Sequence, residues 1–270
     1  MEFINETDKL DQHFLVDQKV IDRFVDEANL SKNDIVVEVG PGKGNISALI
    51  ADKVKKLYLI ELDERLKKYL IPLSYEKGNI EIIFDNVLDT FIPVCDKIIT
   101  SLPYSIVEPF IYKIIKCDFK EILMITGSRF ANNVSENKTT KLSLLTNCFF
   151  KAEKLMDILP ESFNPKPRVL SSIIRLTPIK ENDLDDVMII FRNLYFYADK
   201  KIKNGLVESF IRLNYLKGTK LTQKESKSIV NELNLNENLL NKTFNEVSND
   251  ELKILYDSIW GYINGKKICL

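Results

Sequence analysis

The fold of this chain is decided by the stretch Val36-Val37-Glu38-Val39-Gly40-Pro41-Gly42-Lys43-Gly44, an apolar, mostly branched run that ends in three glycines spaced two apart. A buried strand that stops in a glycine turn before a helix lets the polar groups of a ligand approach bare backbone. The next apolar run, Leu57–Ile60, ends in Glu61, at the place where nucleotide-binding sheets hold a ribose. The G-x-G-x-G spacing differs from the dinucleotide spacing G-x-G-x-x-G and is typical of S-adenosylmethionine (SAM) sites. A turn with a purely structural role is the alternative that this stretch alone leaves open.

Short apolar runs alternate with longer amphipathic ones from residue 35 to about residue 178. This alternation predicts an α/β domain with a doubly wound, mostly parallel sheet that is covered by helices on both faces. The expected strands are Ile35–Val39, Lys56–Ile60, Ile80–Phe84, Lys97–Thr100, Glu121–Ile125, Ala152–Ile158 and Ser172–Thr177. The expected helices are Gln18–Ala28, Asn45–Ala51, Glu64–Ser74, Val107–Lys116 and Lys141–Phe150. The last two strands lie close together in the sequence and are expected to pair as an antiparallel edge.

The composition changes after Pro178, where the polar and acidic segment Lys180–Asp186 is followed by helical patterns only. These patterns span Val187–Tyr197, Lys200–Leu213, Gln223–Leu233, Glu237–Leu240 and Asp250–Asn264. We therefore expect a cofactor-binding domain over residues 1–180 and a small α-helical domain over residues 181–270. Basic residues predominate between residues 200 and 227, which fits either nucleic-acid contact or a solvated helical face. They are Lys200, Lys201, Lys203, Arg212, Lys217, Lys220, Lys224 and Lys227, against Glu208 and Glu225.

The overall composition excludes several classes of protein. With 45% hydrophobic and 29% charged residues the chain is globular rather than disordered. No apolar run approaches the roughly twenty residues that span a bilayer, and the acidic start lacks a signal-peptide pattern, so we expect a cytoplasmic protein without membrane contact. The four cysteines are scattered and His13 is the only histidine, which excludes a catalytic triad and predicts no metal site. Chemistry must then depend on carboxylates, amides, hydroxyls and aromatic rings, or on a cofactor.

The tetrad Ser101-Leu102-Pro103-Tyr104 follows the expected strand Lys97–Thr100. Residues at the carboxyl end of a parallel strand face the ligand crevice. Methyltransferases that act on amino groups place such a tetrad there: a polar side chain and a neighbouring carbonyl accept hydrogen bonds from the amine, and the aromatic ring stacks on the base. An ordinary turn is the alternative when the tetrad is considered alone.

Two further segments complete a pattern. Asp11-Gln12-His13-Phe14-Leu15-Val16-Asp17 resembles G-Q-x-F-L-x-D, and residues Phe163 to Leu176 resemble F-x-P-x-P-x-V-x-S-x-x-x-R-L. With the glycine stretch and the tetrad, four segments in the same order resemble the rRNA adenine dimethyltransferases, with spacing closest to the archaeal members. This family dimethylates N6 of two adjacent adenosines in a hairpin loop near the 3′ end of small-subunit rRNA, with SAM as methyl donor.

The resemblance implies a role for each matching residue. It places the SAM site at His13, Leu15, Gly40, Gly42, Gly44, Glu61, Asn86 and Ser101. It places the acceptor site at Ser101, Leu102, Pro103, Tyr104 and Phe163, with Tyr104 and Phe163 on either side of the target adenine, although a core role for Phe163 stays open. It implies RNA contacts at Arg129, Lys166, Arg168, Lys200, Lys201 and Lys203, a small-subunit ribosomal particle as partner, and a monomeric protein.

The chain departs from the family pattern at functional positions. Asn86 replaces the aspartate expected at the SAM adenine, and its neighbour Asp85 is a candidate substitute, although adjacent strand residues point in opposite directions. Ser101 replaces an asparagine. Serine has a shorter side chain and offers a single hydroxyl oxygen to the acceptor amine.

Other departures affect the expected RNA contacts. Gly127-Ser128-Arg129 replaces a segment with glutamine and glutamate, and Tyr197–Lys203 replaces an arginine-rich segment. These departures leave a second hypothesis open, namely an RNA-binding ribosome-assembly factor with weakened or lost catalysis. A transcription factor akin to the mitochondrial relatives is the third.

Overall fold

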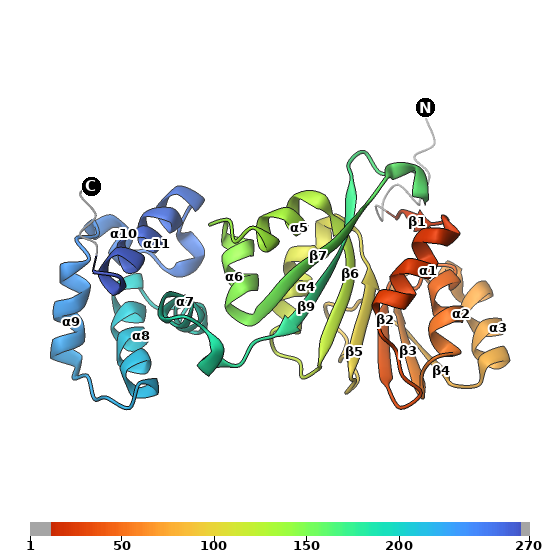
Figure 1. The fold of residues 1–270 in the computed structure, drawn as a ribbon, viewed down its shortest axis with the longest axis horizontal. Helices are drawn as coiled ribbons and strands as arrows, with labels where there is room; N and C mark the ends of the chain where they lie inside the picture. Colours follow the sequence, from red (N-terminus) through yellow and green to blue (C-terminus); the bar gives the residue numbers. More distant parts are fainter. Residues whose placement is uncertain (1–11, 266–270) are drawn as a thin grey trace. The chain divides into compact units, whose positions relative to one another are not determined.

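The computed structural model describes residues 12–265, so Asp11 of the opening motif and Cys269 lie outside the described residues. Its main feature is a seven-stranded sheet with the strand order β4-β3-β2-β5-β6-β9-β7 (Figure 1). The strands are β2 (Ile35–Val39), β3 (Lys56–Glu61), β4 (Ile80–Phe84), β5 (Lys97–Ser101), β6 (Glu121–Gly127), β7 (Phe150–Ile158) and β9 (Ser171–Pro178). Strands β2 to β6 are parallel, and β9 pairs with β6 in the antiparallel sense. The predicted doubly wound, mostly parallel sheet is confirmed.

The stretch that decides the fold forms the centre of this sheet. Strand β2 is paired on both sides, with β3 and with β5, and four of its five residues are buried. A strand covered on both faces by helices must be apolar on both faces, which explains why all of its residues except Glu38 are apolar. Pairing at both edges also satisfies its backbone hydrogen bonds, so the chain leaves the sheet only at Gly40.

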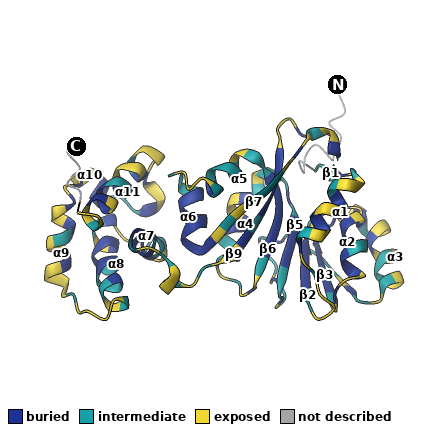
Figure 2. Ribbon diagram, in the orientation of Figure 1, coloured by how far each residue is buried: buried dark blue, intermediate teal, exposed yellow. Residues whose placement is uncertain are grey.

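Helices cover both faces of the sheet. Helices α1, α2 and α3 pack on one another, whereas α4 and α5 lie on the other face (Figure 1). Their bounds are α1 (Gln18–Glu27), α2 (Asn45–Ala51), α3 (Lys67–Lys77), α4 (Val107–Ile114) and α5 (Ser128–Ser135). Buried residues line the strands and the inner side of each helix (Figure 2). Helix α1 contributes Phe24, which is completely buried. Helix α5 was not among the predicted helices.

A second sheet of two short strands joins distant parts of the sequence. Strand β1 (Phe14–Leu15) pairs with β8 (Phe163–Asn164) in the antiparallel sense, with Leu15 opposite Phe163. The pairing brings the opening motif next to the segment that begins at Phe163. Val16 and Asp17 continue the contact, because both of their backbone N–H groups donate to the carbonyl of Ser162.

The contacts divide the described residues into two compact units. The first ends at Ser135 and resumes for Lys151–Pro178, and the second consists of Glu136–Phe150 and the residues from Ile179 onward. The second unit contains α6 (Lys141–Phe149), α7 (Asp186–Phe196), α8 (Ile202–Leu216), α9 (Gln223–Glu232), α10 (Glu237–Asn241) and α11 (Asn249–Ile263). It differs from the expected domain 181–270 because α6 packs on α7. Within residues 12–265 no helix is long and apolar enough to cross a membrane.

Candidate functional site

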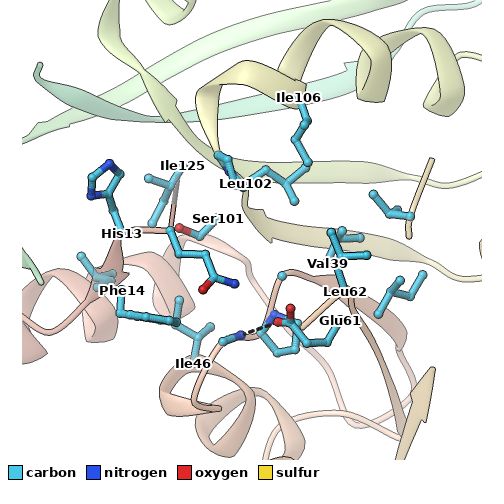
Figure 3. A pocket seen from close by; sticks show the side chains of 18 of the residues that line it. His13, Phe14, Val39, Ile46, Glu61, Leu62, Ser101, Leu102, Ile106 and Ile125 are labelled. Carbon is cyan, nitrogen blue, oxygen red and sulfur yellow. Dashed lines mark hydrogen bonds between the residues drawn. The ribbon is translucent and has the colours of Figure 1, made fainter. Parts of the chain in front are cut away.

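A cavity of about 270 Å³ lies in the first unit, at the carboxyl ends of the central strands. The glycine turn after β2, Glu61 at the end of β3 and the tetrad after β5 all line it, together with the opening motif and Phe163. Figure 3 shows side chains from these separate elements around the same space. Parallel strands place their carboxyl ends at one edge of the sheet, which is why segments far apart in the sequence meet here.

The glycine turn supplies bare backbone to this cavity. Gly40, Gly42 and Gly44 have φ values of +72°, +59° and +85°, a region that favours glycine. Gly40 and Gly42 line the cavity, whereas Gly44, also predicted to bind SAM, does not: a Cβ there would lie 2.9 Å from Leu73 of α3. At Gly42 an added Cβ would lie 2.9 Å from Cδ1 of Phe14. Phe14 in β1 therefore closes over the turn, and the space for a side chain at residue 42 does not exist.

Glu61 is a buried carboxylate held by the backbone around it. Its Oε2 accepts a hydrogen bond from the N–H of Gly42 at 3.1 Å, and its Oε1 accepts one from the N–H of Asp63 at 2.9 Å. Burial raises the pKa of Glu61, and these two backbone hydrogen bonds oppose the rise. A fixed carboxylate of this kind offers acceptors for the two hydroxyls of a ribose.

Glu38, the acidic residue in the stretch that decides the fold, is a second buried carboxyl. It is 2% exposed and does not line the cavity. Burial, with a smaller contribution from the charge of Glu61, raises the pKa of Glu38 to about 8, although the neighbouring Ser47 hydroxyl opposes the rise. Burial therefore favours the protonated, neutral form of Glu38.

Asn86 uses its side chain to shape its own loop. Its Oδ1 accepts a hydrogen bond from the N–H of Leu88 at 3.0 Å, and its Nδ2 donates to Asp89 at 2.7 Å. Asp85 and Asn86 both line the cavity. Because β4 ends at Phe84, neither residue belongs to a strand, and the alternation of side chains along a strand does not apply to them.

The tetrad begins at the last residue of β5. Ser101 is half-buried, Leu102 is buried, and the 3₁₀ turn η3 (Tyr104–Ile106) starts immediately after Pro103. The Tyr104 hydroxyl forms a hydrogen bond with that of Ser171, and the Tyr104 and His13 ring centroids lie 6.4 Å apart with an angle of 29° between the planes.

Phe163 lines the same cavity as Tyr104 but is only 3% exposed and belongs to the hydrophobic core. The core role that the sequence left open is therefore real, and an adenine held between Tyr104 and Phe163 stays a prediction.

The basic residues expected to contact RNA fall in both units. Arg129 in α5 and Lys166 and Arg168 between β8 and β9 are exposed in the first unit. In the second unit Lys200 and Lys201 are exposed, and Lys203 is half-buried in α8. The contacts of these residues with RNA stay predictions.

Several residues that line the cavity were not assigned a role from the sequence, among them Gln12, Phe14 and Leu62. Gln12 is the second letter of the opening motif, and its buried Oε1 has no hydrogen-bond partner among the described residues. The His13 ring is held by a hydrogen bond, because its Nδ1 lies 2.8 Å from the carbonyl oxygen of Pro165. Among residues 12–265 no group of three His, Cys, Asp or Glu side chains could hold a metal ion.

Comparison with known proteins agrees with this geometry. Residues 4–248 match the family model described as ribosomal RNA adenine dimethylase. A probable ribosomal RNA small subunit methyltransferase A from Methanococcus aeolicus is 30% identical over 275 residues, which cover 98% of this chain and 100% of that protein. The protein of the same description from Methanosarcina barkeri is 37% identical over 214 residues, or 76% of this chain and 73% of that protein.

Two solved structures share the fold. The crystal structure of a dimethyladenosine transferase from Plasmodium falciparum has a TM-score of 0.62 at 23% identity and covers 94% of this chain and 99% of its own. The 23S rRNA methyltransferase ErmE has a TM-score of 0.60 at 21% identity, with coverage of 91% and 98%. Because the family model matches most of its residues, this chain belongs to the ribosomal RNA adenine dimethylase family.

Proposed function

We propose that this protein transfers methyl groups from SAM to N6 of two adjacent adenosines, two methyls to each, in a hairpin loop near the 3′ end of small-subunit rRNA. The observation that carries the proposal is the shared cavity: the glycine turn and Glu61 line it together with the tetrad Ser101–Tyr104. A methyl donor and an amine acceptor can therefore meet within one enclosure, which is the geometry that a direct transfer needs.

The residues present fit SAM. Gly40 and Gly42 offer bare backbone, and Glu61 offers two fixed oxygens to a ribose. The unpartnered Oε1 of Gln12 is an acceptor suited to an ammonium group, such as that of the methionine end. When bound, SAM supplies a methyl group on a positively charged sulfur, which is the electrophile of the reaction.

The chain's own residues orient the acceptor. The Ser101 hydroxyl and the carbonyl beside it accept hydrogen bonds from the adenine amine, which directs the nitrogen lone pair toward the methyl group. Pro103 stiffens the loop, and the Tyr104 ring stacks on the base after the base has left its own stack. The amine proton can leave to water, so no general base is required.

The partner that fits this function is an immature small ribosomal subunit. Single-stranded loops are the usual targets of base-specific RNA recognition, since their bases can be splayed out. Exposed lysines and arginines of both units would bind phosphates. We propose a monomeric protein that acts in the cytoplasm during ribosome biogenesis.

The experiment that tests this function measures transfer of labelled methyl groups from SAM to small subunits that lack the modification. Fully modified subunits are the control. We expect transfer only to the unmodified particles, a reduced rate for Ser101→Ala, and a rate at least equal to that of the unaltered protein for Ser101→Asn. SAM binding without any transfer would favour the assembly-factor hypothesis.

A further inference from the structure

Tyr104 rests on a pair of small residues that face each other across two strands. Gly127 at the end of β6 is the direct partner of Ser171 at the start of β9 in the antiparallel ladder. The Tyr104 ring lies beside the first, and its hydroxyl is hydrogen-bonded to the second. The pair therefore flanks the Tyr104 side chain at both of its ends.

Gly127 lies beside the Tyr104 ring. A Cβ built on Gly127 would lie 3.6 Å from Cγ, 3.7 Å from Cδ2 and 3.9 Å from Cδ1 of Tyr104. These are ordinary van der Waals distances, so the ring lies about one methyl group away from the backbone of residue 127. A small residue at this position leaves room for the ring to lie beside the end of β6.

Ser171 fixes the far end of the side chain. It has no exposed surface, and its hydroxyl is hydrogen-bonded to the Tyr104 hydroxyl. A buried hydroxyl without a partner is costly, so each of the two oxygens holds the other in place. The ring of Tyr104 then has a defined position before any base arrives.

The next residue along β9, Ser172, has a different set of partners. Its hydroxyl donates to Asp157 at 2.6 Å and is hydrogen-bonded to Ser128 at 2.7 Å. Ser172 is as fully buried as Ser171, but the side chains of adjacent strand residues point to opposite faces. Ser172 is therefore a matched control: a buried serine hydroxyl on the same strand that does not touch Tyr104.

We propose that the Gly127–Ser171 pair is the seat that positions Tyr104 for stacking on the acceptor base, which makes Ser171 a positioning residue for methyl transfer. This inference rests on the proposed function. An aromatic ring held in advance loses little freedom when the base stacks on it, so the base is presented to the donor in one orientation. Loss of the Ser171 hydroxyl leaves the ring in place on Gly127 but free to tilt.

The test is a double-mutant cycle of Ser171→Ala and Tyr104→Phe, with Ser172→Ala as control. We expect Ser171→Ala and Tyr104→Phe each to lower kcat for methyl transfer about tenfold, with KM for SAM unchanged. The kcat of the double variant should be no lower than that of either single variant. Ser172→Ala lowers thermal stability but leaves kcat within about twofold. Additive losses of kcat in the double variant, or equal losses of kcat in Ser171→Ala and Ser172→Ala, would overturn the proposal that Ser171 positions Tyr104.

A second measurement separates failure of the seat from failure of the proposed function. An RNA hairpin from the 3′ end of small-subunit rRNA carries 2-aminopurine at one target adenosine, and its fluorescence reports stacking on Tyr104. We expect quenching by the unaltered protein and by Ser172→Ala, and weaker quenching by Ser171→Ala. If no protein transfers methyl groups but this difference is present, the proposed function fails and the seat stands. If all of the proteins quench equally, the seat fails.

Discussion

Gly42 is a residue of the SAM site that tolerates little change. Its φ of +59° is costly for any other residue, and an added Cβ would meet the ring of Phe14 at 2.9 Å. We expect Gly42→Ala to weaken SAM binding by at least about tenfold, measured by titration calorimetry. Gly127→Ala is the matched control, since its Cβ meets Tyr104 at an ordinary 3.6 Å and SAM affinity should stay unchanged. Equal affinities of the two variants for SAM would contradict this role of the glycine turn.

Glu38 gives the free energy of unfolding a distinct pH dependence. Its pKa is about 8 in the folded protein against an ordinary 4.5, so the folded state holds an extra proton between these values. Stability from this group is fully present below pH 4.5 and falls as the pH rises through 8. We expect the stability of Glu38→Gln relative to the unaltered protein to be roughly 2–5 kcal/mol more favourable at pH 9 than at pH 5, measured by urea unfolding.

The control for this prediction is Glu81→Gln. The Glu81 side chain is 56% exposed and pairs with Lys56 on the surface. Its effect on the free energy of unfolding should differ by less than about 1 kcal/mol between the two pH values. If Glu38→Gln behaves in the same way, Glu38 does not carry a buried proton.

At the residue scale, the sequence predicted which positions line the cavity better than it predicted what they do there. The glycine turn, Glu61 and the tetrad were found because their spacing follows from strand, turn and helix geometry. The local hydrogen bonds of Asn86 and the near-complete burial of Phe163 could not be predicted, because both depend on atoms that tertiary packing brings into place.

Arg175 is the residue that ties separate elements together. From β9 it forms ion pairs with Glu27 of α1, Glu121 of β6 and Glu153 of β7, and its side chain is only 16% exposed. Removing one partner of a largely buried ion cluster leaves unpaired charge. We expect Arg175→Leu to lower the free energy of unfolding by about 3 kcal/mol in chemical denaturation.

Arg23→Leu provides the comparison for Arg175. Arg23 also pairs with Glu27, but its side chain is 64% exposed. An exposed pair contributes little, so this variant should lose less than about 1 kcal/mol. If Arg23→Leu loses as much free energy of unfolding as Arg175→Leu, the ion pairs that Arg175 forms with three elements add no more stability than one exposed pair.

At the element scale, long periodic segments were predicted well and short pairings were not. All seven strands of the main sheet were expected within two residues of their observed bounds. Strands β1 and β8 have two residues each and therefore show no alternation that a sequence could reveal. Helix α6 was predicted as a helix, but its place in the second unit depends on packing against α7, which lies far along the chain.

For the whole molecule, the helical unit is expected to bind RNA and not SAM. Lys200, Lys201 and Lys203 lie in that unit, and none of them lines the cavity. Replacing all three with serine should weaken binding to the rRNA hairpin and reduce the slope of log affinity against log salt by about 2, with SAM affinity unchanged.

The control replaces Lys53, Lys55 and Lys120 with serine. These residues precede the starts of β3 and β6, at the edge of the sheet opposite the cavity. Because none of them is an expected RNA contact, the salt slope should stay the same. If the slope falls equally in both triple variants, the three lysines of the helical unit contribute to RNA binding only through the total charge of the protein.

We claim that this protein dimethylates two adjacent adenosines of small-subunit rRNA. The most direct measurement incubates it with SAM and unmodified small subunits, then digests the rRNA and locates modified nucleosides by mass spectrometry. We predict two neighbouring N6,N6-dimethyladenosines in the 3′ hairpin, formed only when both protein and SAM are present. Unmethylated adenosines in that hairpin, from a protein that binds SAM and the particle, would contradict the claim.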